Sequence, residues 1–217
     1  MLLSVAYFPP VEYFALLAKY SVVYMEACEN YQKQSWRNRC RILTANGPES
    51  LNVPVVHENG AFELPIRQIR VDYSTPWVLR TERAIESAYS SSPFFVYYKD
   101  EIFGILDSHP VTLWELDMAL IRFFCAKIGI APEIRETQTF VPPGEVLLSG
   151  ELLPSPEELD YRSKLHPKRA NSVMAELGLE REYWQVFKEK FGFVPGLSIM
   201  DLLFNEGPEA ICWLQSR

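Results

Sequence analysis

The sequence has little histidine and cysteine, and neither residue is spaced for recognisable chemistry. Its three histidines are scattered and its four cysteines form no CxxC pair. Neither a metal signature nor a Ser-His-Asp order can be read from these spacings, so we expect no metal ion. In a cytosolic chain, scattered cysteines are mostly small buried apolar residues. We interpret all four in this structural way: Cys28, Cys40, Cys125 and Cys212.

Motifs that carry phosphate or nucleophile chemistry are missing as well. The chain contains no Walker-type glycine-rich loop, no dinucleotide fingerprint and no GxSxG elbow, and we expect no cofactor. No uninterrupted apolar run approaches the length needed to cross a bilayer. The apolar start is broken by Pro9, Pro10 and Glu12 before the core of a signal peptide could form. These absences predict a cytoplasmic protein without membrane insertion.

The composition is that of a globular protein. Of the 217 residues, 48% are hydrophobic and 13% are aromatic. This is enough to bury one sizeable core, and we expect a single domain over residues 1–217. The formal net charge of -7 argues against general nucleic-acid binding, but it leaves room for a local basic pocket.

The order of elements at the start of the chain predicts an α/β fold. Residues 2–7 read as a short buried strand that two prolines stop, a helical stretch follows, and residues 21–27 look like a second strand. This order is typical of a parallel strand pair with a crossover helix. Sites in such sheets lie beyond the carboxyl ends of the strands. We therefore expect residues 7–10 and 26–33 at one edge of a cleft.

Beside this unit, the chain predicts a mixed sheet completed by a β-hairpin, with several packed helices. The turn Asn46-Gly47-Pro48 separates hairpin arms at 37–45 and 51–56. The capping box Thr112-Leu-Trp-Glu115 begins the clearest helix, which continues to Gly129. We expect further helices at 76–88 after a Thr75 cap, at 94–106, at 183–191 and from Ser198 through Trp213, and an extended segment at 133–141.

Residues 30–42 form the strongest charge anomaly. No acidic residue lies between Glu29 and Glu49, whereas four basic residues do: Lys33, Arg37, Arg39 and Arg41. If residues 36–43 are extended, the three arginines share one face of the strand, and Trp36 packs on the other. The planar guanidinium suits phosphate or carboxylate, so this face can bind an anion. The alternative is an edge strand whose charges are merely solvated.

Two later stretches also stand out by their charge. Residues 136–160 contain six acidic residues and no lysine or arginine, and their prolines and glycines predict a loop. Such a loop is either a lid that closes over the arginines or a simple insertion. A second basic cluster follows, in which His166 is either an acid or base near neutral pH or an exposed loop residue. Its cations are Arg162, Lys164, Lys168 and Arg169.

Two specific patterns carry a family resemblance. They are Tyr31-x-Lys33-x-Ser35-Trp36-x-Asn38-Arg39-x-x-Ile42 and Gly192-Phe-x-Pro195-x-Leu197-Ser198-Ile-x-Asp201-Leu-Leu-Phe204-Asn205-x-Gly207-Pro208. With them, nearly the whole chain resembles the WbqC-like proteins, which are associated with O-antigen and other surface-polysaccharide gene clusters. Those proteins usually begin with a His-Gln-Pro group, where this chain has Ala6-Tyr7-Phe8. Any chemistry of that histidine is absent here.

The resemblance implies a role in surface-polysaccharide biosynthesis. We expect an enzyme, such as a transferase, that modifies an activated, nucleotide-linked sugar or transfers a group to one. The alternative is a noncatalytic binding or scaffold protein of the same pathway, with a protein partner. For the small anionic ligand, the candidate diphosphate-binding residues are Lys33, Arg37, Arg39 and Arg41, and the candidate sugar-binding residues are Tyr31, Ser35, Asn38 and Asn205. The candidate catalytic residues are His166 and Asp201, although Asp201 and Asn205 also fit helix-cap positions.

Overall fold

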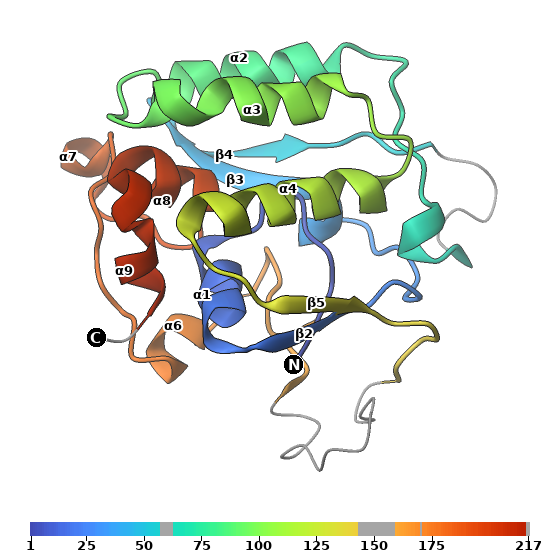
Figure 1. Ribbon diagram of the computed structural model, residues 1–217. Helices are drawn as coiled ribbons and strands as arrows, with labels where there is room; N and C mark the ends of the chain where they lie inside the picture. Colours follow the sequence, from blue (N-terminus) through green and yellow to red (C-terminus); the bar gives the residue numbers. More distant parts are fainter. Residues whose placement is uncertain (57–62, 143–158, 170, 216–217) are drawn as a thin grey trace.

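The protein has the predicted α/β architecture, with a small parallel sheet, a separate hairpin and helices packed between and around them (Figure 1). The computed structural model describes residues 1–56, 63–142, 159–169 and 171–215. In the described part of the chain, no helix combines the length and the apolar character that crossing a membrane requires. Most of the acidic segment, with the lid hypothesis attached to it, lies outside the described residues.

The predicted parallel unit at the start of the chain is confirmed. Strand β1 (Leu2–Leu3), helix α1 (Val11–Lys19) and strand β2 (Val22–Met25) follow one another, and β1 pairs with β2 in parallel. A third strand, β5 (Glu133–Glu136), pairs in parallel with β2, so the sheet order is β1-β2-β5. Nearly all of α1 is buried because it lies between this sheet and the C-terminal helices.

The predicted hairpin is also confirmed, with different bounds. Strands β3 (Arg39–Thr44) and β4 (Gly47–Asn52) pair in antiparallel and form a sheet of their own. The second arm starts at Gly47, whose φ of 105° is one that glycine adopts readily. The first arm starts at Arg39 and not at residue 37, and the condition that residues 36–43 are all extended is not met, because Trp36–Asn38 form the 3-10 helix η1.

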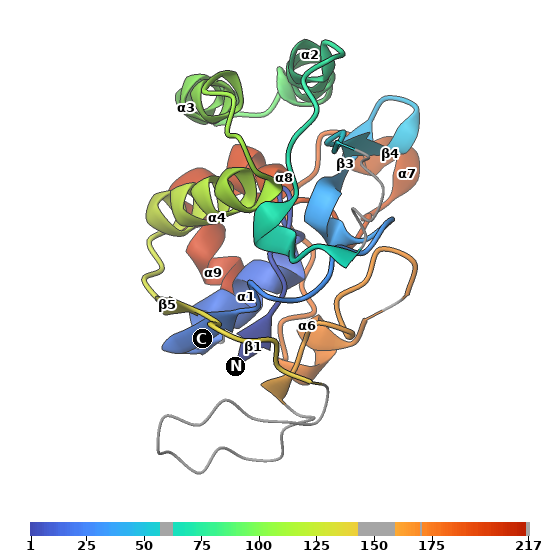
Figure 2. The same ribbon diagram turned by 90° about the vertical axis from the view of Figure 1, so that its right-hand side faces the viewer.

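Three long helices cover the hairpin and the parallel sheet. Helices α2 (Trp77–Tyr89) and α3 (Phe95–Asp107) lie side by side as an outer layer, and α4 (Leu113–Ile128) lies beneath α3 (Figure 2). The capping box of α4 is confirmed, since Thr112 Oγ1 accepts from the amide of Glu115 and the Glu115 carboxylate accepts from the amide of Thr112. Thr75 does not cap α2, because Pro76 occupies the N-cap position.

The C-terminal part consists of short helices, most of which pack on α1 or α4. They are α6 (Val173–Glu176), α7 (Lys188–Phe191), α8 (Ile199–Glu206), the 3-10 helix η4 (Gly207–Ala210) and α9 (Ile211–Leu214), while a further 3-10 helix, η3 (Ile66–Gln68), precedes α2. Helix α7 lies instead against the turn of the hairpin. The prediction of one helix over 183–191 is wrong before Lys188. There, the Gln185 side chain bonds both the amide and the carbonyl of Val194, which fixes a loop instead.

The hydrophobic core is formed by aromatic and aliphatic side chains between α1, α4 and α8. The Phe124 ring is 5.9 Å from the Phe14 ring and 6.0 Å from the Phe8 ring, both in edge-on contact. Burial of such side chains supplies most of the favourable free energy of folding. Of the four cysteines, Cys40 and Cys125 are buried as predicted, Cys28 is half-buried and Cys212 is exposed.

Candidate functional site

The basic stretch lies at the carboxyl ends of β1 and β2. After β2 ends at Met25, the chain runs along this edge to η1. In the segment that follows β1, the amide of Tyr7 donates to the carbonyl of Trp36 at 2.8 Å. The segments that leave the two strands therefore meet here, where open parallel sheets generally place their sites.

Arg37 is a structural residue and does not share a face with the other two arginines. Its guanidinium donates to Glu29 through Nε at 2.9 Å and Nη2 at 2.6 Å, and Nη2 also donates to Ser4 Oγ at 2.8 Å. Both side chains of this ion pair are buried, with exposed fractions of 5% and 6%. The acidic partner lies just before the stretch that is free of acidic residues, and strand periodicity could not reveal the pairing.

Two of the predicted sugar-binding residues, Ser35 and Asn38, help to hold the backbone of this stretch. The Ser35 hydroxyl donates to the carbonyl of Gln32 and accepts from the amide of Arg37, which makes it the cap of η1. The Asn38 amide donates to the carbonyl of Val53 at 3.0 Å. Tyr31 is buried, and burial raises the pKa of its hydroxyl to about 12, so this group stays protonated and can donate.

Arg39 and Arg41 lie on the same face of β3, as predicted for alternate residues of a strand. Their neighbours Cys40 and Ile42 are buried on the opposite face. Across the hairpin, Arg39 is paired with Asn52 and Arg41 with Ser50, so the outer face of the hairpin is polar. The Nε of Arg39 is buried and has no hydrogen-bond partner among the described residues.

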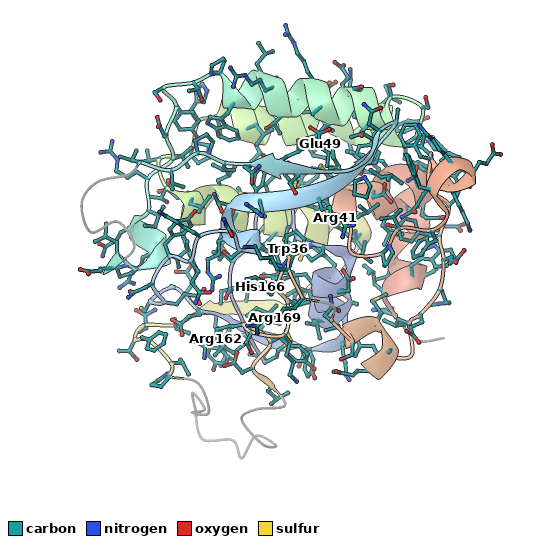
Figure 3. The ribbon with its side chains drawn as sticks, turned by 180° about the vertical axis from the view of Figure 1, so that it is seen from behind. Trp36, Arg41, Glu49, Arg162, His166 and Arg169 are labelled. Carbon is teal, nitrogen blue, oxygen red and sulfur yellow. The ribbon has the colours of Figure 1, made fainter. Side chains whose placement is uncertain are left out.

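The second basic cluster joins the first in space. The amine of Lys168, in the second cluster, donates to the side-chain oxygen of Gln34, which lies within the first basic stretch. Trp36, Arg41, His166 and Arg169 all lie on one face of the molecule (Figure 3). Four cations on this face form no salt bridge with a carboxylate in the described part of the chain: Arg39, Arg41, Lys168 and Arg169. We call these four residues, together with His166, the basic face.

His166 lies at the centre of this positive charge. Burial lowers the pKa of its imidazole, and the neighbouring cations Arg169, Lys168, Arg37 and Arg39 lower it further. The ring is therefore neutral at pH 7. Its Nδ1 accepts from the amide of Lys168 at 3.2 Å, which leaves Nε2 to carry the proton. His166 can thus donate a hydrogen bond from Nε2 to an anion.

Arg162, by contrast, belongs to a buried structural network at the sheet edge. It donates to both carboxylate oxygens of Asp160, at 2.9 and 2.6 Å, and to Glu26 at 3.2 Å. Glu26 is fully buried after β2, and it also accepts from Thr137 and from the amide of Val141. This network ties the segment after β5 to the segment that carries His166, and it therefore positions the basic face.

A pocket of about 590 Å³ lies between the start of α1, helix α6 and helix α9. Glu12, in the first turn of α1, is one of its lining residues and is only 6% exposed. Burial raises the pKa of the Glu12 carboxyl, and the Asn171 side chain and the charge of Arg41 oppose this rise. The backbone of Arg41 lies near the pocket, because its carbonyl accepts from the amide of Ser198, two residues after the lining residue Gly196. In the sequence, Glu12 stands out only as an interruption of the apolar start.

Asp201 and Asn205 lie on α8, behind one wall of this pocket. Ser198 caps α8 by accepting from the amide of Met200, whereas the Asp201 carboxylate accepts from the Tyr183 hydroxyl at 2.8 Å and from the Gln185 amide at 3.0 Å. Burial raises the pKa of Asp201 to about 6 despite these bonds. The Asn205 amide donates to the carbonyl of Asp201. Neither residue lines the pocket itself, but Tyr183 does.

The two stretches that carry the family resemblance meet in the structure. The amide of Ser198 donates to the carbonyl of Arg41 at 2.8 Å, and the amide of Ile199 donates to the carbonyl of Pro9. The C-terminal stretch is thereby attached to β3 and to the segment after β1. The strand ends, the basic face and the pocket wall form one connected region.

Comparison with known proteins agrees with this resemblance. The model of the WbqC-like protein family matches residues 5–212. The chain is also 29% identical over 222 residues to the uncharacterized protein Rv1507c of Mycobacterium tuberculosis (strain ATCC 25618 / H37Rv), in an alignment that covers 96% of this chain and 94% of that protein. No solved structure matches the chain. The protein thus belongs to the WbqC-like protein family.

Proposed function

We propose that this protein is a cytoplasmic enzyme of surface-polysaccharide biosynthesis that modifies an activated, nucleotide-linked sugar or transfers a group to one. The observation that carries the proposal is the convergence of two basic stretches, distant in sequence, on one face beside a pocket. A diphosphate needs several cationic donors at one place, and the basic face provides them in a protein with a net charge of -7. The pocket volume falls within the range of about 300–1,000 Å³ that is typical of ligand sites.

In this proposal, Arg39 and Arg41 bind the diphosphate, and the exposed Lys33 is a further candidate. The buried, unpartnered Nε of Arg39 gains a hydrogen-bond acceptor when an anion binds. His166 donates a hydrogen bond from Nε2 to a phosphate oxygen and keeps that proton, because a neutral imidazole is not an acid near pH 7. Arg37 holds the site together through Glu29, and Asp201 positions Tyr183 in the pocket wall.

The alternative function, a noncatalytic scaffold for a protein partner, has one supporting observation. Val96 and Tyr97 are adjacent on α3 and are 63% and 71% exposed. Two exposed apolar residues on an outer helix are a small patch, and isolated surface apolar side chains are common in soluble proteins. The pocket beside the basic face favours the enzyme.

The test is thermal unfolding of the purified protein with a panel of nucleoside-diphosphate sugars. A ligand that binds only the folded state at about 100 times its Kd adds about 2.7 kcal/mol of stability. In a protein of this size that raises the Tm by about 5–10 °C. We expect such a shift in the wild type, and its loss in Arg39→Ala and Arg41→Ala.

Arg122→Ala is the matched control, because Arg122 is an exposed arginine on α4 outside the basic face. It should keep the full shift. If no member of the panel stabilises the wild type, or if all three variants lose the shift equally, the nucleotide-sugar proposal is wrong. A capture experiment with pathway proteins, comparing the wild type with Tyr97→Ser, would then test the scaffold.

A further inference from the structure

The pocket beside the basic face contains a buried carboxyl group, Glu12, with one oxygen that lacks a bonding partner among the described residues. Oε2 of Glu12 is buried and has no hydrogen-bond partner among the described residues. The other oxygen, Oε1, lies 3.7 Å from the position that a Cβ atom would take at Gly196, so the side chain closely approaches the backbone there. A buried polar atom without a partner is costly, and a ligand, an ion or an ordered water can supply the missing partner.

The rest of the pocket is acidic and apolar. Glu180 and Glu182 are exposed lining residues, and Arg181 is the cation of the lining. The Arg181 guanidinium, however, donates to the carbonyls of Cys212 and Gln215, at 2.7 and 3.0 Å, and so attaches the C-terminal segment. Glu182 is paired with Lys188, with 2.8 Å between Oε2 and Nζ, so the lining carboxyl groups without a salt bridge among the described residues are Glu12 and Glu180. They outnumber the one lining cation, Arg181.

The pocket walls suit a compact ligand with some apolar surface. Tyr183, Phe193 and Trp213 contribute aromatic rings, and Tyr183 contacts both of the other rings edge-on, at 5.2 and 6.3 Å between centroids. Tyr183 is fixed by its hydrogen bond to Asp201. Aromatic side chains bind the apolar face of a ligand and stabilise a nearby cationic group.

We propose that this pocket binds a small molecule with a primary ammonium group, which donates hydrogen bonds to the Glu12 carboxylate while the body of the molecule contacts the aromatic wall. The inference rests on the proposed function in one respect. There, the basic face binds the diphosphate, and the ligand in the pocket is either the sugar moiety or the second reactant. Two sources share this chemistry: an amino sugar and an amino-acid derivative. The volume of about 590 Å³ accommodates either.

The experiment measures binding of amines to the full chain at pH 7 by saturation-transfer NMR and by titration calorimetry. The probes are D-glucosamine and D-galactosamine for the first source, and glycinamide and phenylalaninamide for the second. Each probe is paired with its N-acetyl derivative, which has the same body without the ammonium group. We expect at least one amine to bind and its N-acetyl derivative to bind at least about tenfold more weakly, because a hydrogen bond to a charged group contributes that much or more.

The test variant is Glu12→Gln, which keeps the shape of the side chain and removes its charge. We expect it to weaken binding of the amine about 10-fold to 100-fold and to keep or raise the Tm, because a buried carboxyl with an unpartnered oxygen is replaced by a neutral group. Glu180→Gln removes one charge from an exposed lining residue of the same pocket and is the control. It should change the affinity by less than about threefold.

The possible outcomes separate this inference from the proposed function. If the amines bind no better than their N-acetyl derivatives, or if Glu12→Gln binds the amine as the wild type does, the inference is wrong, whatever the nucleotide sugars show. If the amine binds through Glu12 but no nucleoside-diphosphate sugar stabilises the protein, the amine site stands and the nucleotide-sugar proposal fails. Preference for the amino sugars or for the amino-acid amides identifies the source of the amine.

Discussion

The clearest consequence of the structure concerns Arg37, which the sequence places among the ligand-binding residues and the structure places in a buried ion pair. We expect Arg37→Met to destabilise the protein strongly, because it leaves the Glu29 carboxylate buried without its bidentate partner. Removing one member of a buried pair costs about 3–5 kcal/mol. At about 2–4 °C of Tm for each kcal/mol in a protein of this size, the Tm should fall by about 6–20 °C.

The size of this effect can be separated from a simple loss of packing. The double variant Arg37→Met/Glu29→Leu replaces both charges with apolar side chains, and substitutions of this kind in buried pairs are often close to neutral. Its Tm should therefore lie well above the value obtained by adding the losses of the single variants Arg37→Met and Glu29→Leu. Such non-additivity indicates that the two residues interact. Lys99→Met is the control, since the Lys99–Glu86 pair is 3.5 Å long and largely solvated. It should change stability by less than about 1 kcal/mol.

Thermal unfolding by circular dichroism, with and without a nucleoside-diphosphate sugar, measures all four variants. Two results would refute the reasoning. In one, Arg37→Met has the wild-type Tm but loses the shift on adding ligand, which would make Arg37 a binding residue. In the other, the double variant loses as much stability as the sum of the single variants, which would show that Arg37 and Glu29 do not interact.

Three further predictions concern buried and local features. Asp117 is fully buried, and neither of its carboxyl oxygens has a partner in the described chain. Burial raises the pKa of this carboxyl well above 3.8, so the folded protein keeps a proton that the unfolded chain loses. The free energy of unfolding therefore falls as the pH rises from 3.8 towards the pKa of the folded state. Asp117→Asn should thus raise the Tm, by little near pH 4 and by more at pH 7, and a gain that shrinks with rising pH would contradict this. Gly207→Ala would place its Cβ 2.5 Å from the Phe94 ring at a φ of 57°, whereas the Cβ of Gly129→Ala meets no atom within 4 Å. In denaturant unfolding, the first variant should lose about 1–3 kcal/mol more of its free energy of unfolding than the second. Equal losses would show that the ring moves aside. Thr112→Ala removes one half of the capping box and should cost about 1 kcal/mol, and an unchanged unfolding midpoint would mean that the cap contributes nothing to stability.

The sequence predicted those parts of the fold whose signals are local. The capping box at Thr112 and the turn at Asn46 depend on residues a few positions apart, and both are present in the structure. The helix expected from Tyr183 failed because Gln185 bonds Val194 across a loop and Tyr183 bonds Asp201, and these long-range contacts outweigh an apolar stripe. Local propensity is a weak prior when tertiary hydrogen bonds compete with it.

The candidate site was predicted only in part for the same reason. The sequence identified two basic stretches as separate features, and only the fold brings Lys168 to Gln34. Nothing in the spacing distinguished Arg37 from Arg39, because the difference depends on where Glu29 lies in space. Glu12 could not be selected at all, since a single carboxylate in a helical first turn is common, and its burial beside a pocket is a tertiary property.

The pattern that identifies the family in residues 31–42 is mainly a pattern of folding. Ser35 caps η1, Asn38 attaches that turn to the segment after β4, and Ile42 is buried in the core. A chain that reproduces these positions reproduces the turn and the strand, whatever its ligand. Arg41 and Glu12 lie outside the pattern, and in our proposals they select the anion and the amine. Experiments on the reaction should therefore begin with variants of Arg39, Arg41 and Glu12, because variants of Ser35, Asn38 and Ile42 will weaken the fold together with any activity.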